Sequence, residues 1–224
     1  DIGTNGEIAL YHRGRIYCCA TAAGPAFEGA GIRHGLPAQT GAICAAAYDP
    51  ARGGLVYRTI GDAAPRGVCG SGLIDTVAVL LAQGAVDPSG RLLGGGHSLD
   101  ACMAVDQGGP VFRFPASDIA LTQSDIRQLQ LAKGALQAGV FTLLEYAGIG
   151  TEALDVCYLC GGFGAYLNLG AAERIGLLPP ALADKTVVLG NAALAGAARA
   201  LLDRAQLAEL KRIAAACEYI ELSA

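Results

Sequence analysis

Hydrophobic and polar positions alternate along the first sixty residues in the manner of short β-strands. Residues 6–22, GEIALYHRGRIYCCATA, place β-branched and aromatic runs on either side of a polar turn at His12–Arg15. Residues 41–61, GAICAAAYDPARGGLVYRTIG, repeat the pattern around Asp49–Pro50 and Gly53–Gly54. The pattern therefore predicts two β-hairpins.

Helical spacing follows in two segments. Residues 69–84, CGSGLIDTVAVLLAQG, repeat apolar positions every three or four residues and end on Gly84. Thr122 and Asp125 have the spacing of a capping box and precede the strongest helical segment, SDIRQLQLAKGALQAGVFTLLEYAG. One apolar stripe runs along that segment: Ile126, Leu129, Leu136, Val140, Leu143 and Leu144.

The rest of the chain alternates between strand and helix. Residues 85–118 are rich in Gly and Pro and are predicted to form a surface insertion with a short hairpin. Strands are expected at 155–160 and 185–190, with a loop and a short helix between them and two helices after them. This order predicts a mixed α/β layer fold in one domain over 1–224.

Composition narrows the classes of function. The chain has 224 residues, 53% of them hydrophobic, and a net charge of −4 without a basic run. Phosphate-backbone binding needs clustered cations, so nucleic acid is not an expected partner. Without a long uncharged apolar run or a signal peptide, neither a membrane nor export is expected, and the prediction is a cytoplasmic protein.

The eight cysteines lie in apolar stretches of a chain large enough to fold without disulfides, which favours reduced, buried thiols. Cys157 and Cys160 form a C-x-x-C within a predicted strand. Residues three apart on a strand point to opposite faces, so this pair is not expected to ligate one metal ion.

Familiar catalytic motifs are missing from the sequence. It contains no G-x-x-x-x-G-K-[ST], no G-x-G-x-x-G, no H-E-x-x-H and no G-x-S-x-G. Three glycine clusters at strand ends remain: DIGTNG at 1–6, GGFG at 161–164 and GNAALAGAARA at 190–200. The chemistry is therefore expected at backbone groups in these turns.

The first cluster has the properties of a phosphate loop. Glycine tolerates positive φ and has no Cβ, which lets backbone N–H groups turn toward anionic oxygens. Asp1 would hold a hydrated Mg²⁺ and Thr4 would donate a hydroxyl hydrogen bond. An ordinary hairpin turn is an equally good interpretation of this cluster alone. A loop of this kind also needs a preceding strand to present it, so we expect the chain to be the second half of a longer protein.

The second and third clusters have structural alternatives too. Paired glycines after a buried strand allow a flat ligand such as adenine to lie against the backbone, or simply form a tight turn. In the third cluster, the small residues Gly190, Ala193, Gly196 and Ala197 allow close packing of a helix against a neighbour.

Taken together, these motifs resemble the second lobe of the actin, hexokinase and Hsp70 superfamily, which has a ribonuclease-H-like fold. More narrowly, the chain resembles the C-terminal domain of the ATP-dependent reductive activators of corrinoid proteins. The stretches that carry this resemblance are DIGTNGEI, ATAAGPAFEGA, CGSGLID, LTQSDIRQLQLAKGAL and GGFGAYLNLGAAERIGLLP.

The resemblance implies the function of a larger protein. Members carry an N-terminal 2Fe–2S domain and a first lobe, both absent from this chain, and use ATP with Mg²⁺ to return Co(II) of a corrinoid protein to Co(I) for methyl transfer. The implied partner is a corrinoid protein or corrinoid-dependent methyltransferase, with a homodimer as a further possibility. This half alone is not expected to be active.

The resemblance also implies roles for individual residues. Phosphates and metal would contact Asp1, Gly3, Thr4, Asn5 and Gly6, and the adenosine would contact Gly161, Gly162 and Phe163.

Three further side chains each have two interpretations, and a fourth, Asp75, has one. Lys133 would reach the nucleotide or lie on the surface, and Glu28 would orient water or metal as a catalytic group or remain solvated. Ser71 would add to an anion site or simply cap its helix. Asp75 is expected only to complement the helix dipole.

Two other functions remain open at this point. One is a small-molecule kinase of the same superfamily, whose catalytic base would come largely from the missing lobe. The other is a non-catalytic module for dimerisation or docking, in which the glycine clusters are structural.

Overall fold

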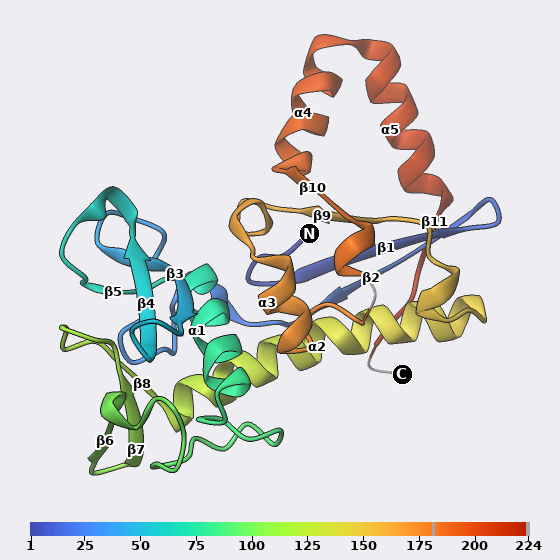
Figure 1. The fold of residues 1–224 in the computed structure, drawn as a ribbon. Helices are drawn as coiled ribbons and strands as arrows, with labels where there is room; N and C mark the ends of the chain where they lie inside the picture. Colours follow the sequence, from blue (N-terminus) through green and yellow to red (C-terminus); the bar gives the residue numbers. More distant parts are fainter. Residues whose placement is uncertain (181, 223–224) are drawn as a thin grey trace.

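The computed structural model describes residues 1–180 and 182–222, and one long helix organises it. This helix, α2 (Gln123–Ala147), runs in Figure 1 from the group of small sheets at the left to a position beneath the first hairpin, in the group at the right. One group lies with α1 (Gly70–Ala82), and the other lies with α3 (Leu169–Arg174). The expected mixed α/β fold is confirmed, as four small sheets and five α-helices within the described residues.

Both predicted hairpins form. Strands β1 (Gly6–His12) and β2 (Arg15–Thr21) pair antiparallel, and β11 (Cys217–Tyr219) adds to β2 in parallel. The second sheet has the order β4-β3-β5, and its strands are β3 (Ala42–Asp49), β4 (Gly54–Thr59) and β5 (Gly67–Val68). The short strands β5 and β11 were not predicted, because so few residues carry no readable alternation.

The segment 85–118 contains the expected hairpin, with β6 (Met103–Asp106) and β7 (Gly109–Arg113) joined by β8 (Ala120–Thr122) in one sheet. The segment also supplies buried side chains to the main core. These are Ala85, Val86, Leu92, Leu99, Phe112 and Phe114. It is therefore part of the packing around α1 and α2 as well as part of the surface.

The last third of the chain contains β9 (Cys157–Cys160) and β10 (Thr186–Gly190), which pair in parallel. Helices α4 (Ala192–Leu202) and α5 (Arg204–Ala216) then project from the rest of the molecule (Figure 1). Neither helix has a buried residue within the described chain, and a Cβ added at Gly196 would meet no atom within 4 Å. None of the described helices is long and apolar enough to cross a membrane.

The capping box predicted at the start of α2 is present. The Thr122 hydroxyl accepts from the N–H of Asp125, and the Asp125 carboxylate accepts from the N–H of Thr122 at 2.7 Å. The same carboxylate accepts from the N–H of Arg33 at 2.7 Å, so it ties the loop after the first hairpin to α2. This buried carboxylate therefore anchors two segments as well as starting a helix.

Asp75 has a different environment from the one expected. It is only 6% exposed, and its Oδ2 accepts from the N–H of Ala46 at 3.2 Å. The Asn168 side chain also donates to it, while Oδ1 has no partner within the described residues. Burial raises the pKa of Asp75, against the opposing effect of these two hydrogen bonds. Asp75 therefore ties α1 to β3, and the expectation that it only complements the helix dipole was wrong.

Thr122→Ala should lower the free energy of unfolding by about 1 kcal/mol, because the N–H of Asp125 loses its acceptor. Thr122→Ser keeps the hydroxyl and should retain most of the stability. Denaturant unfolding of both variants measures the difference. Equal stability of Thr122→Ala and the parent protein would contradict the capping role.

Asp75→Asn should change how stability depends on pH. Because the pKa of Asp75 is raised in the folded state, the folded protein keeps this proton at pH values where the unfolded chain releases it. The contribution of Asp75 to the free energy of unfolding therefore falls as pH rises through that range. Asn does not titrate. The free energy of unfolding of the variant, minus that of the parent, should therefore rise with pH above the ordinary Asp range. A difference that stays constant with pH would contradict this account.

Candidate functional site

The loop at residues 1–6 folds back on itself and leaves backbone donors exposed. The N–H of Gly3 donates to the carbonyl of Asn5 at 2.9 Å, and Glu7 N–H donates to the carbonyl of Asp1 at 3.2 Å. Thr4 and Asn5 are exposed, and their N–H groups have no partner among the described residues. Two unpaired donors at a loop tip are the kind of group that anionic oxygens bind.

The glycines of this loop are not required for the reason expected, which was a positive φ. Neither Gly3 nor Gly6 has a positive φ, so the left-handed conformation is not the reason for glycine at either position. Gly6 is buried, and a Cβ there would collide with the Leu136 side chain of α2 and lie 2.6 Å from Thr21 Oγ1. Gly6 is therefore required for packing beneath the loop.

Glu28 reaches the tip of the same loop. It ends the short 3₁₀-helix Pro25–Glu28, and its Oε1 accepts a hydrogen bond from the Thr4 hydroxyl at 2.8 Å. The Glu28 side chain is exposed. A carboxylate from a second segment thus lies beside the unpaired N–H groups of Thr4 and Asn5.

The second glycine cluster packs directly against the first. Gly161 has a φ of 99°, and a Cβ at this position would lie 2.5 Å from Asp1 Oδ1 and 2.9 Å from the Ile2 carbonyl. Its N–H donates to the carbonyl of Gly190 at 2.8 Å. Asp1, Gly161 and Gly190 come from three clusters far apart in the sequence, and the fold brings them together.

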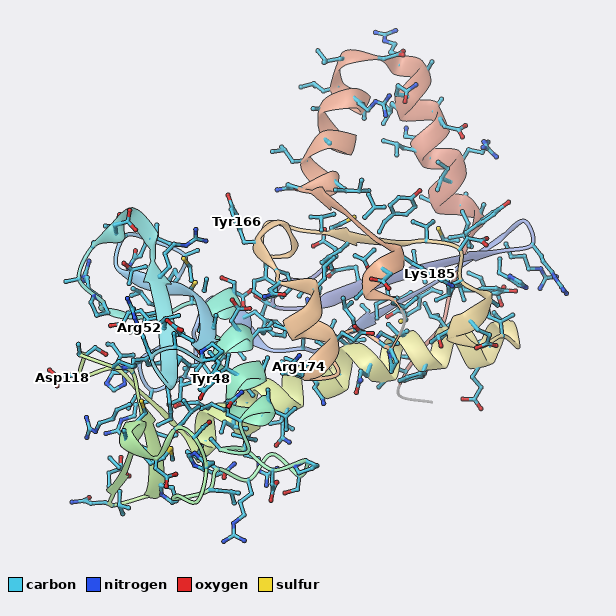
Figure 2. The ribbon with its side chains drawn as sticks, viewed as in Figure 1. Tyr48, Arg52, Asp118, Tyr166, Arg174 and Lys185 are labelled. Atoms are coloured by element: carbon cyan, nitrogen blue, oxygen red, sulfur yellow. The ribbon has the colours of Figure 1, made fainter. Side chains whose placement is uncertain are left out.

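The loop after β9 presents both a glycine and aromatic rings. Gly162 is exposed, with no atom within 4 Å of an added Cβ. The Phe163 ring stacks on Phe27 with centroids 4.9 Å apart, so one of its faces is already covered. Tyr166, further along the loop, is 78% exposed and points outward in Figure 2.

Sequence reasoning missed two contacts of this site. The first is Phe27, which precedes Glu28 in GPAFEGA. The second is Gly70 at the start of α1, where a Cβ would collide with the Phe27 carbonyl and lie 2.7 Å from Phe163 Cε2. An aromatic residue next to the candidate Glu28, between two glycines, was the available signal for Phe27. Nothing in the sequence marked Gly70 as a neighbour of Phe163.

Ser71 and Lys133 are engaged elsewhere. The N-cap of α1 is Cys69, and the buried Ser71 hydroxyl donates to the carbonyl of Cys44 at 2.8 Å, so the capping expectation was wrong. Lys133 Nζ donates to the carbonyl of Ile175, the C-cap of α3, at 2.6 Å. Neither group forms a hydrogen bond with Asp1, Thr4 or Gly161 within the described residues.

The donor set suits a metal held largely through water and phosphate. Within the described residues no group of three or more His, Cys, Asp or Glu side chains lies close enough to hold a metal ion. Mg²⁺ usually keeps several waters and binds proteins through one or two carboxylates plus substrate phosphates. Asp1, which lies against Gly161, and Glu28, which accepts from the Thr4 hydroxyl, are two carboxylates of the kind that this mode requires.

Comparison with known proteins finds one matching family and several similar proteins. The family described as "C-terminal domain of RACo the ASKHA domain" matches residues 1–224. The chain is 35% identical over its whole length to the corrinoid activation enzyme RamQ of Eubacterium limosum. It is 32% identical over 96% of its length to a [Co(II) methylated amine-specific corrinoid protein] reductase of Methanosarcina barkeri.

A solved structure described as a reductive activator for corrinoid,iron-sulfur protein matches 99% of the chain, with 41% identity and a TM-score of 0.88. The chain spans 39% and 40% of the two curated relatives and 36% of the solved one. It therefore belongs to the family of RACo C-terminal domains, the ASKHA domain.

Proposed function

We propose that this chain is the nucleotide-binding half of an ATP-dependent reductive activator that returns a corrinoid protein from Co(II) to Co(I). The observation that carries the proposal is the convergence of three glycine turns on one point, where Gly161 lies against Asp1 and donates to Gly190. Such a convergence of backbone turns is suited to a ligand with several anionic oxygens and a flat base.

Each residue around this point would contact a different part of the nucleotide. The N–H groups of Thr4 and Asn5 bind phosphate oxygens, and Asp1 holds Mg²⁺ through water, with Glu28 orienting a water molecule or the metal. The exposed backbone of Gly162 and the uncovered face of Phe163 receive the adenosine. Bound MgATP would supply the phosphoanhydride bond whose hydrolysis releases free energy.

The link from ATP to electron transfer is conformational. A ligand shifts an equilibrium between two states only by the difference in its affinity for them. By these assignments the nucleotide would contact the loop at residues 1–6, Glu28 and the loop after β9, so its loss would alter their relative positions. The rest of the full-length protein contributes the first lobe and the 2Fe–2S domain that delivers the electron.

The corrinoid partner rests on the printed names of the relatives. RamQ is named as a corrinoid activation enzyme, the second relative as a corrinoid protein reductase, and the solved structure as a corrinoid activator. ATP turnover that requires a sugar or acid substrate, and no corrinoid protein, would replace this proposal with the kinase alternative.

Gly161→Ala in the full-length protein should raise the Kd for MgATP by about tenfold or more. The added Cβ would crowd Asp1, and alanine at a φ of 99° is strained. Gly53→Ala is the matched control, since Gly53 has a φ of 62° but no atom within 4 Å of the added Cβ. Calorimetric titration measures both. An equal loss of affinity in the two variants would mean that backbone strain alone is responsible.

Asp1→Asn tests the metal role without adding atoms. Loss of the carboxylate charge should weaken MgATP binding about tenfold and slow ATP-dependent formation of Co(I). Asp118→Asn removes an exposed carboxylate on the β7 to β8 loop, which Figure 2 shows on the far side of α1 from the loop after β9. If Asp1→Asn binds and reduces like this control, the proposed site is wrong.

A further inference from the structure

The loop after β9, residues 161–168, is attached to the rest of the structure at both of its ends. At the first end, Gly161 packs against Asp1. At the second end the loop runs into α3, and its last residue, Asn168, is the N-cap of that helix. The backbone and ring that are proposed to receive the adenosine lie between these two attachments.

Helix α1 supports the middle of the loop. An added Cβ at Gly70, the first residue of α1, would lie 2.7 Å from Phe163 Cε2. The Phe163 ring also stacks on Phe27, with ring centroids 4.9 Å apart. The position of Phe163 relative to α1 therefore decides which face of its ring is left for the adenosine.

Asn168 uses both polar atoms of its side-chain amide. Its Oδ1 accepts from the N–H of Ala171 at 3.1 Å, which caps α3. Its Nδ2 donates to the carboxylate of Asp75 on α1. Helix α3 packs beside α1 (Figure 1). An amide supplies a donor and an acceptor from one side chain, whereas a carboxylate supplies acceptors alone. Asn168 thus links the end of the loop to α1 while it caps α3.

Asp75 is itself held firmly in place. It is 6% exposed, and its Oδ2 also accepts from the N–H of Ala46 on β3 at 3.2 Å. One turn earlier on α1, the Ser71 hydroxyl donates to the carbonyl of Cys44 on the same strand at 2.8 Å. Residues four apart lie on one face of a helix, so both bonds fix the same face of α1 on β3. The loop is therefore attached to a rigid part of the structure.

The other end of α3 is attached separately, to α2. Gln137 Nε2 donates to the carbonyl of Gly176, and Lys133 Nζ donates to the carbonyl of Ile175 at 2.6 Å. These two bonds hold the carboxyl end of α3. Loss of one of them would loosen the same helix without releasing the end of the loop.

From this geometry we infer that Asn168 and Asp75 are positioning residues for the adenosine. Their hydrogen bond fixes the downstream end of the loop after β9 on α1 and so holds Gly162 and Phe163 where the base of the nucleotide binds. Both residues act through the loop and not by contact with the nucleotide. The inference rests on the proposed function, and it gives a role in base recognition to a buried carboxylate of α1.

The arrangement predicts an effect on the base of the nucleotide and not on its phosphates. The proposed phosphate and metal contacts are Thr4, Asn5 and Asp1, which lie on a different loop. Inorganic tripolyphosphate has a chain of three phosphates and no base. Binding of Mg²⁺-tripolyphosphate therefore reports on the loop at residues 1–6, whereas binding of MgATP reports on both loops.

Asn168→Asp in the full-length protein keeps an acceptor for the N–H of Ala171 and replaces the donor to Asp75 by a second carboxylate. This variant should raise the Kd for MgATP about tenfold and leave the Kd for Mg²⁺-tripolyphosphate within about twofold of the parent value. Calorimetric titration of the two ligands measures both effects.

The double variant Asn168→Asp with Asp75→Asn reverses the donor and the acceptor of the bond. The new amide on α1 still accepts from the N–H of Ala46 and donates to the new carboxylate on the loop. The Kd for MgATP should return to within about threefold of the parent value, because the two changes restore one interaction. A purely structural loss at each position would instead make the double variant weaker than either single variant.

Gln137→Glu is the matched control, since it makes the same change from amide to carboxylate at the other end of α3. It should leave the Kd for MgATP unchanged. An equal rise in Kd for Gln137→Glu and Asn168→Asp would overturn the inference, because it would assign the effect to general loosening of α3.

The inference would also be overturned if the double variant bound MgATP no better than Asn168→Asp, or if tripolyphosphate binding weakened as much as MgATP binding. A parent protein that binds MgATP no more weakly than its variants is evidence against the inference alone only when all of them bind. If the parent protein binds neither ligand, the proposed function fails, and the inference fails with it.

Discussion

The close approach of the first hairpin to α2 is the constraint on which the rest of the structure depends. Gly6 of the hairpin packs against α2, and Gly139 of α2 packs against the hairpin. A Cβ at Gly6 would collide with Leu136, and a Cβ at Gly139 would lie 2.5 Å from Thr21 Cγ2 and 2.6 Å from Ile8 Cδ1. Because the strand and the helix approach this closely, the loop at residues 1–6 is held at a fixed distance from α2. This position brings the loop into contact with Glu28 and Gly161.

The candidate site is made mainly of backbone rather than of reactive side chains. Its donors are N–H groups at loop tips, its close contacts depend on missing Cβ atoms at Gly70 and Gly161, and its charged groups are Asp1 and Glu28. A site of this kind binds and orients a ligand that brings its own reactive bond.

Several surfaces of the chain are apolar and exposed. Helices α4 and α5 carry leucines such as Leu201, 87% exposed, and the edges of β1 and β9 face an apolar cavity. Large exposed apolar surfaces usually mark contact with another protein segment. The coverage of 36% to 40% of the relatives' length is consistent with this.

The sequence by itself determined the local elements and the identity of the loops. Alternation and turn residues located both hairpins, the Thr122–Asp125 pair located the start of α2, and the glycine clusters singled out the turns that contain Asp1 and Gly161 as candidates. These features depend on neighbours in the chain, which is why a single sequence reveals them.

Only the tertiary structure decided which groups meet. Ser71 and Lys133 were ambiguous because a hydroxyl or an ammonium group bonds whichever acceptor the fold provides, here the carbonyls of Cys44 and Ile175. The Phe27–Phe163 stack and the burial of Asp75 against β3 likewise join residues distant in sequence. Local pattern contains no information on such distances, because they are set by how the elements pack on α1 and α2.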